Sequence, residues 1–184
     1  MKNASTLRVL LVILAVSVII LAAAVGVYVG VTLQHKAHPK NCAVDPQASE
    51  VLAAVDDVNA RYPLEGYSPI SWEYRGESNY SPCSELSYAI VGPAGHASPD
   101  YFTYLIFFHK GKYIGVDDTE HQQQAYEVTP DGEALAVQYI DYEEFHRSGE
   151  AAAYISRFTT PVRFYWDGDK VERQGRMPNQ SLSR

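Results

Sequence analysis

The chain has 184 residues, 15 of them lysine or arginine and 22 aspartate or glutamate, with a formal net charge of −7 and 46% hydrophobic residues. Residues 1–40 hold four of the 15 basic residues and no acid, which leaves 11 basic and 22 acidic residues, a net charge of about −11, in residues 41–184. Such an acidic segment repels phosphate backbones and anionic headgroups, which argues against nucleic-acid binding and against attachment through a polybasic surface.

The first predicted element is a membrane-spanning helix over residues 9–33. This stretch has no proline and no ionisable group except the phenol of Tyr28. About 20 apolar residues are enough to cross a bilayer, and a helix satisfies its own backbone groups there. We expect a cytoplasmic N-terminus at 1–8, a signal anchor in contact with membrane lipid at 9–33, and a polar stalk at 34–41.

Two further interpretations of the apolar segment remain open. Residues 22–24 are three alanines and resemble a signal-peptidase site, so the segment could be cleaved. Cleavage there would leave a second apolar stretch at the new N-terminus, which favours an uncleaved anchor. Gly26 and Gly30 form a GxxxG pair, which can bring two membrane helices together and would suit a structural subunit that dimerises through this helix.

The two cysteines of the chain, Cys42 and Cys83, both follow the apolar segment. An even number of cysteines after an export segment is typical of an oxidising compartment and predicts a disulfide bond. A pair of buried free thiols is the alternative, and the spacing does not fit a structural zinc site. We therefore expect a single-pass protein of the plasma membrane, with its C-terminal domain outside the cytoplasm.

Residues 42–178 are expected to form one domain of the α+β class, with one amphipathic helix packed on a mainly antiparallel β-sheet. Asp45 can cap this helix and Pro46 can occupy its first position. Apolar residues then recur at helical spacing until Pro63. The residues expected to face the sheet are Ala48, Val51, Leu52, Val55 and Val58.

After Pro63 the pattern changes to short runs rich in Tyr, Phe, Ile, Val and Trp, separated by Gly, Pro and Asp. We predict strands at 70–75, 85–91, 101–109, 112–116, 125–129, 133–142, 162–166 and 169–173.

The turn residues between these strands predict antiparallel neighbours. Lys110-Gly111, residues 130–132 and Asp167-Gly168 have the composition of short hairpin loops. Residues 143–158 interrupt the strand pattern, and a short helix or a covering loop is expected near Glu150. The tail is polar from Met177, and residues 179–184 are expected to be flexible.

Two segments carry a resemblance to a known family. FFHKGKYIG at 107–115 and VRFYWDGDKV at 162–171, together with strand patterns between Cys83 and Pro178, resemble the LppP/LprE lipoprotein family of the actinobacterial envelope. The resemblance implies an exported envelope domain of mixed α and β structure, without an established enzymatic activity. The chain departs from the family because no lipid-attachment cysteine follows its apolar segment, so the helix itself must be the anchor.

No nucleophile motif, metal-ligand spacing or cofactor motif is apparent, and we expect no catalytic residue, metal or cofactor. His109, at the end of a hydrophobic run, is the best single candidate for a polar role. Residues 117–121 and 141–146 each place acids near a histidine, although solvated loops have the same composition.

The sequence therefore favours a non-enzymatic envelope module that binds an envelope protein, a wall polymer or an amphipathic ligand. This hypothesis predicts a groove or apolar cavity beside the sheet, without a cluster of convergent titratable groups. The alternatives are an envelope hydrolase that uses His109 or an acidic loop, and the structural subunit named above.

Overall fold

The computed structural model describes residues 41–64, 70–95 and 102–182, which belong to one compact unit. The predicted membrane span at 9–33 and the residues that precede it lie outside this set. Among the described residues, no helix is long and apolar enough to cross a bilayer.

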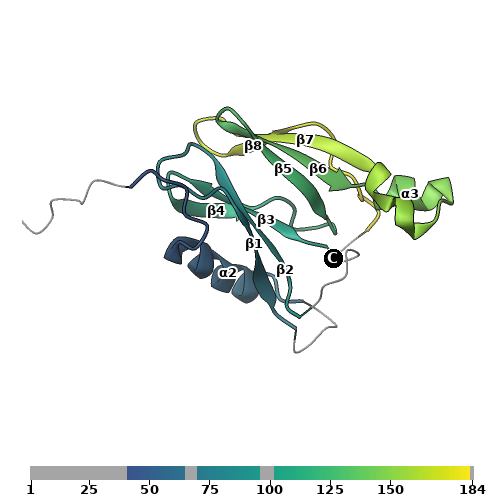
Figure 1. Ribbon diagram of the computed structural model, residues 1–184, viewed down its shortest axis with the longest axis horizontal. Coiled ribbons are helices and arrows are strands. Elements are labelled where there is room, and N and C mark those ends of the chain that lie inside the picture. Colours follow the sequence, from purple (N-terminus) through teal and green to yellow (C-terminus); the bar gives the residue numbers. More distant parts are fainter. Residues whose placement is uncertain (1–40, 65–69, 96–101, 183–184) are drawn as a thin grey trace, which may run out of the picture. The chain divides into compact units, whose positions relative to one another are not determined.

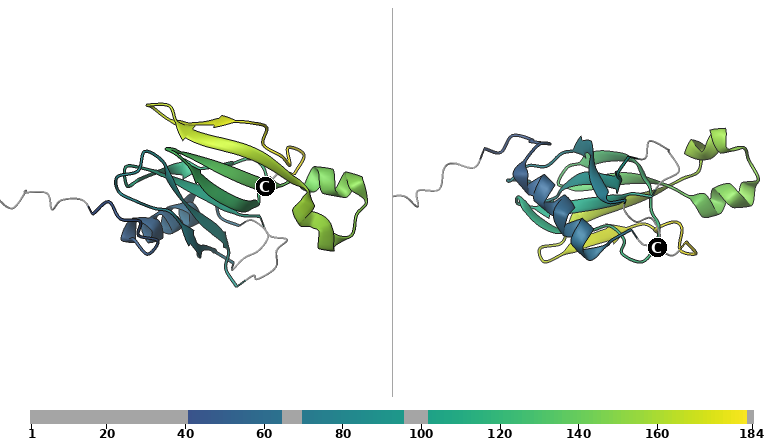
Figure 2. Two further views of the ribbon diagram at one scale, coloured as in Figure 1. Left: turned by 45° about the horizontal axis from the view of Figure 1, so that its top comes forward. Right: turned by 90° about the horizontal axis from the view of Figure 1, so that it is seen from below.

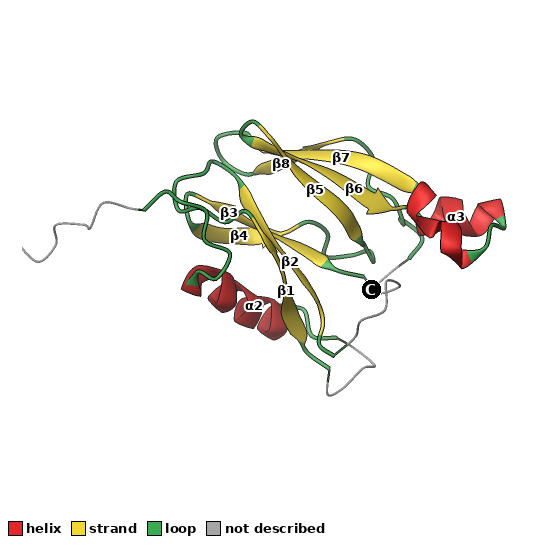
Figure 3. Cartoon of the chain, viewed as in Figure 1, coloured by secondary structure: helices red, strands yellow, loops and turns green. Residues whose placement is uncertain are grey.

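All eight predicted strands are present, and their ends differ from the predicted ones by at most three residues (Figure 3). Two α-helices and one 3-10 helix complete the described part of the chain. In chain order the elements are α2 (Ser49–Arg61), β1 (Trp72–Ser78), β2 (Ser87–Pro93), β3 (Tyr104–His109), β4 (Lys112–Val116), β5 (Ala125–Asp131), β6 (Ala134–Ile140), α3 (Tyr142–Ser148), η1 (Ala152–Arg157), β7 (Thr159–Trp166) and β8 (Val171–Gln174).

The strands form two antiparallel sheets rather than the single sheet that the sequence predicts. Each sheet has four strands in chain order, β1-β2-β3-β4 and β5-β6-β7-β8. Figure 1 shows the two sheets as layers, with α2 on the outer side of the first. Hairpin turns specify which strands are neighbours, but they do not reveal that the chain leaves one sheet after β4 and starts another at β5. Outside the named strands, an isolated antiparallel bridge pairs Thr103 with Gln123.

Strand β3 lies between two hydrophobic clusters. Leu105 and Phe107 belong to the cluster between the sheets, whereas Ile106 and Phe108 belong to the cluster under α2. Successive side chains of a strand point to opposite faces. All four side chains are buried because both faces of β3 are covered. The strand predicted at 101–109 is thus confirmed for its described part, and it is covered on both faces.

Helix α2 begins later than predicted and uses a slightly different face. The carboxylate of Asp45 accepts a hydrogen bond from the backbone N–H of Gln47 at 3.1 Å, in a turn that precedes the helix, and the N-cap residue is Ala48. Leu52 is 52% exposed, and Ala54 is buried instead. Positions three and four residues apart share a face of a helix. The buried face of α2 is therefore formed by Val51, Ala54, Val55 and Val58, and Leu52 lies outside it.

The predicted disulfide is present and joins Cys42 to Cys83, with the two Cα atoms 5.2 Å apart. Two nearby hydrogen bonds hold the same segments together: the hydroxyl of Ser81 donates to the carbonyl of Cys42, and the backbone N–H of Asp45 donates to the carbonyl of Tyr80. The segment before α2 is therefore fixed to the loop before β2.

The interruption at 143–158 is helical over most of its length. Helix α3 starts at Tyr142, where the carboxylate of Asp141 accepts a hydrogen bond from the backbone N–H of Glu144 at 2.8 Å and caps the helix. Near Glu150, where a short helix or a covering loop is expected, the chain forms the 3-10 helix η1 at Ala152–Arg157. Figure 2 shows this helical pair at the end of the second sheet, beyond β6 and β7.

Residues 177–179 are buried, including Asn179, which the sequence places in the flexible tail at 179–184. The side-chain amide of Asn179 donates to the carbonyl of Ile140 at 2.9 Å, and its oxygen accepts from the backbone N–H of Tyr142 at 2.8 Å. The C-terminal segment is thus fastened to the end of β6 and the start of α3.

Candidate functional site

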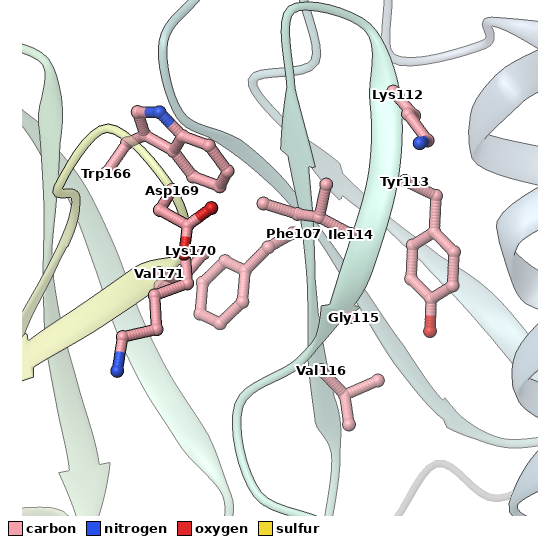
Figure 4. A pocket seen from close by; sticks show the side chains of 10 residues that line it. All are labelled: Phe107, Lys112, Tyr113, Ile114, Gly115, Val116, Trp166, Asp169, Lys170 and Val171. Atoms are coloured by element: carbon pink, nitrogen blue, oxygen red, sulfur yellow. The ribbon is translucent and has the colours of Figure 1, made fainter.

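A groove of about 560 Å³ lies between edge strand β4 of the first sheet and the β7–β8 hairpin of the second (Figure 4). A second opening of about 270 Å³ continues it along β8 and shares its floor residue Phe107. We call the first opening the seam groove, because it separates the edges of the two sheets. It is lined by Phe107, Lys112, Tyr113, Ile114, Gly115, Val116, Trp166, Asp169, Lys170 and Val171.

The turn between β3 and β4 fixes one wall of the seam groove. Lys110 and Gly111 have φ angles of 46° and 82°, and they form the predicted two-residue hairpin loop. A Cβ atom on Gly111 would lie 3.0 Å from the Cα of Pro82. Glycine is therefore required here both by the backbone angle and by the close approach of the neighbouring loop.

A β-bulge shapes the same wall. The pairing of β3 with β4 shifts between Phe107 and Phe108, so Ile114 is an extra residue in β4, and Gly115 follows it at a φ of 142°. The side chain of Ile114 is half-buried and packs against the core between the sheets.

The opposite wall is the β7–β8 hairpin, whose loop is longer than the predicted two residues. Trp166 pairs with Val171, so four residues form the loop. The carboxylate of Asp167 accepts hydrogen bonds from the backbone N–H groups of Asp169 and Lys170, at 2.8 and 2.9 Å. These bonds favour the charged form of Asp167 and lower its pKa. They also close the loop as a side chain–backbone turn.

His109 lies at the end of β3 and stacks on Trp166, with ring centroids 3.9 Å apart and an interplanar angle of 17°. Its Nδ1 is 2.7 Å from the carbonyl oxygen of Glu85. Because a carbonyl only accepts, Nδ1 carries the hydrogen. The carboxylate of Glu85 pairs with Lys110 at 2.7 Å, and this hydrogen bond lowers the pKa of Glu85. The polar candidate from the sequence is thus a hydrogen-bonded, stacked residue behind the hairpin wall.

Charges on the seam groove and its continuation balance. Three cationic and three anionic residues line them: Lys112, Lys170, Arg173, Asp117, Asp169 and Glu172. The ammonium of Lys170 pairs with Glu172 at 2.6 Å, and the carboxylate of Asp117 accepts from the Tyr139 hydroxyl at 2.8 Å. Within the described part of the chain, Lys112, Asp169 and Arg173 form no ion pair.

The first acidic segment, 117–121, brings a histidine and a carboxylate together, but neither residue lines the seam groove. Nδ1 of His121 is 3.2 Å from Oδ2 of Asp118, whose side chain is 8% exposed. Burial opposes ionisation of Asp118, yet hydrogen bonds from the backbone of His121 and Glu120 and from Gln123 lower its pKa. This carboxylate organises the loop between the two sheets.

In the second acidic segment, 141–146, none of the ion pairs among the described residues joins His146 to Asp141, Glu143 or Glu144. Asp141 caps α3 and also accepts hydrogen bonds from Thr160 and Arg176, at 2.9 and 2.7 Å. The ring of His146 instead packs near the rings of Tyr142 and Phe145. Among the described residues, no group of three or more His, Cys, Asp and Glu side chains could hold a metal ion.

Sequence reasoning missed Trp166, Asp169 and Lys112 as groove residues. A signal was available, because the two segments that carry the family resemblance, 107–115 and 162–171, provide nine of the ten lining residues. The two segments lie more than 45 positions apart in the sequence. Only the packing of one sheet on the other shows that they face each other.

Comparison with known protein families matches residues 78–169, half of the chain, to the family described as LppP/LprE lipoprotein. The match spans β4 and β7 and ends within the β7–β8 loop. No curated protein and no solved structure matches the chain.

Proposed function

The chain belongs to the LppP/LprE lipoprotein family, and from this premise we propose that it is a membrane-anchored, non-enzymatic module of the cell envelope that binds an amphipathic ligand in the seam groove. The observation that carries this proposal is the groove itself. A hollow of about 560 Å³ with an aromatic and aliphatic lining and a few charged groups has the size and composition of ligand sites in proteins.

The arrangement of titratable groups supports binding rather than catalysis. Two side chains near the hairpin wall are held by contacts within the fold: His109 is stacked and hydrogen-bonded, and Asp167 closes its own loop. A hydrolase would need a histidine and a carboxylate that converge on one reacting atom. Two histidines lie near a carboxylate: Nδ1 of His109 is 3.6 Å from Oε2 of Glu85, which pairs with Lys110, and His121 meets Asp118 in the loop between the sheets.

We propose that residues 9–33 anchor this module as a single membrane-spanning helix, with the domain outside the cytoplasm. The apolar segment is long enough, and the disulfide between Cys42 and Cys83 fits an oxidising space. Membership of the family supports an association with the envelope. In this proposal the helix serves as the anchor in place of a lipid on an attachment cysteine.

The proposal is tested by blocking the seam groove without changing the core. Lys112→Cys introduces an exposed thiol at its rim, and Glu133→Cys introduces a matched thiol in the exposed β5–β6 turn. Each full-length variant, labelled with a bulky maleimide, is mixed with solubilised envelope extract and examined by native mass spectrometry.

We expect an added mass on the wild type and on the variant labelled at position 133, and its loss on the variant labelled at position 112. Retention of the added mass by both labelled variants, or no added mass on the wild type, would contradict the proposal.

A further inference from the structure

One wall of the seam groove is edge strand β4 and the other includes edge strand β8, and both of these strands are poor templates for another strand. Strand β4 contains the bulge at Ile114 and Gly115, and β8 has only four residues. Bulges, short edges and lysine side chains are the features by which proteins prevent pairing at a sheet edge. A ligand of this groove is therefore held by side chains rather than by the main-chain ladder of an added peptide.

The charges of the groove favour a polar ligand without net charge. Three cationic and three anionic side chains line it and its continuation. A strongly anionic polymer would meet carboxylates of Asp169 and Glu172, and an acyl chain would cover the charges of Lys112 and Asp169 without a hydrogen bond in return. A ligand with several neutral donors and acceptors satisfies both signs of charge.

Trp166 gives the groove a flat apolar surface that is held in place. Its indole is half-buried and is stacked on His109, so the ring does not need to be ordered when a ligand arrives. Figure 4 shows Trp166 and Asp169 on one wall, with Phe107 and Ile114 between them and Tyr113. Pyranose rings have this dual character, because their C–H faces pack on aromatic rings while their hydroxyl groups bond carboxylates and ammonium groups.

We propose that the seam groove binds a neutral oligosaccharide, with a sugar ring packed against Trp166 and its hydroxyl groups bonded to Asp169 and Lys112. This inference rests on the proposed binding function and specifies the ligand class of the same groove.

Isothermal titration calorimetry on the full-length chain in lipid nanodiscs tests the inference, with maltotetraose, cellotetraose and N-acetylchitotetraose as probes. We expect at least one probe to bind, and Trp166→Ala to weaken it by about tenfold or more, the factor that corresponds to about 1.4 kcal/mol. Asp169→Asn should weaken it less. Tyr126→Ala, which removes a 54% exposed aromatic residue on β5 away from the groove, is the matched control and should leave the affinity unchanged.

Trp166→Phe keeps an aromatic ring and should retain most of the affinity. This variant shows whether weaker binding by Trp166→Ala comes from loss of the aromatic surface or from loss of the fold. Titration with oleate and with an extended decapeptide separates this inference from the proposed function. The saccharide inference is wrong, and the binding function stands, if no saccharide binds while oleate or the decapeptide does and the label at position 112 blocks that binding. If none of these probes and no component of the envelope extract binds, both are wrong.

Discussion

The ring of His109 lies against the ring of Trp166 at the ends of β3 and β7, and one step along the same strands Phe107 packs on Phe164 with centroids 4.9 Å apart. These two pairs connect the first sheet to the second at the seam groove, which Phe107 and Trp166 line. The position of the β7–β8 hairpin, and hence the width of the groove, depends on them.

Replacement of Trp166 by alanine is expected to lower the free energy of unfolding by about 2 kcal/mol, less than for a fully buried aromatic residue. His109→Ala should cost about 1 kcal/mol, and the double variant should reveal a coupling of about 0.5–1.5 kcal/mol between the rings. Urea denaturation of the four proteins measures these values. Strict additivity would show that the stacked rings do not stabilise each other.

The disulfide between Cys42 and Cys83 closes a loop with a sequence separation of 41. In the chain-entropy model, its loss lowers the free energy of unfolding by about 4 kcal/mol, an upper value because the reduced unfolded chain retains some structure. The double variant Cys42→Ser, Cys83→Ser should match the reduced wild type in guanidinium denaturation. Two thiols that react in the denatured, unreduced wild type would contradict the assignment.

The Asp141 carboxylate makes stability depend on pH. Burial opposes its ionisation, but hydrogen bonds from Glu144 N–H, Thr160 and Arg176 outweigh burial and lower its pKa in the folded state. A lowered folded pKa stabilises the protein above the unfolded value of about 3.9, and this contribution disappears as the pH falls through the folded pKa.

Asp141→Asn should therefore be less stable than the wild type by about 1–2 kcal/mol at pH 7, the scale of a helix cap and a charged hydrogen bond. The difference should shrink as the pH falls from 5 to 2. Denaturant melts across this range measure it, and a difference that stays constant would show that the carboxylate charge is not responsible.

Much of the fold follows from local patterns, because hairpin turns and strand runs are set by neighbouring residues. The hairpin loop at Lys110-Gly111 and the strand that contains Phe107 are predicted correctly for this reason. The division into two sheets depends on how the chain continues after β4, and no local turn signal encodes it. Leu52 shows the same limit on a smaller scale, since its exposure depends on the angle at which α2 meets the first sheet.

The candidate site could be predicted only in part. The hypothesis of a binding module predicts a groove beside the sheet, and the position of His109 after an apolar strand makes it a candidate for a polar role. Its partner Trp166 comes from a strand of the other sheet, 57 positions away, and such cross-sheet contacts depend on tertiary packing. Asn179 was expected in a flexible tail, because nothing in its sequence context shows the buried carbonyl of Ile140 that it satisfies.

The proposed anchor predicts the behaviour of the full-length chain in cells. Carbonate extraction should leave it in the membrane pellet, because a spanning helix is not released by high pH. A variant that lacks residues 9–33 should be found in the soluble fraction. Release of the full-length chain by carbonate would contradict an integral anchor.

The most direct test of the binding function uses the two tryptophans of the chain as reporters. Trp166 lines the seam groove, whereas Trp72 is 3% exposed in the cluster under α2. Fluorine NMR of the full-length chain labelled with 5-fluorotryptophan, in lipid nanodiscs, follows both resonances while solubilised envelope extract is added. Binding in the seam groove predicts a saturable shift of the Trp166 resonance and an unchanged Trp72 resonance; a shift of Trp72 alone, or of neither, would contradict it.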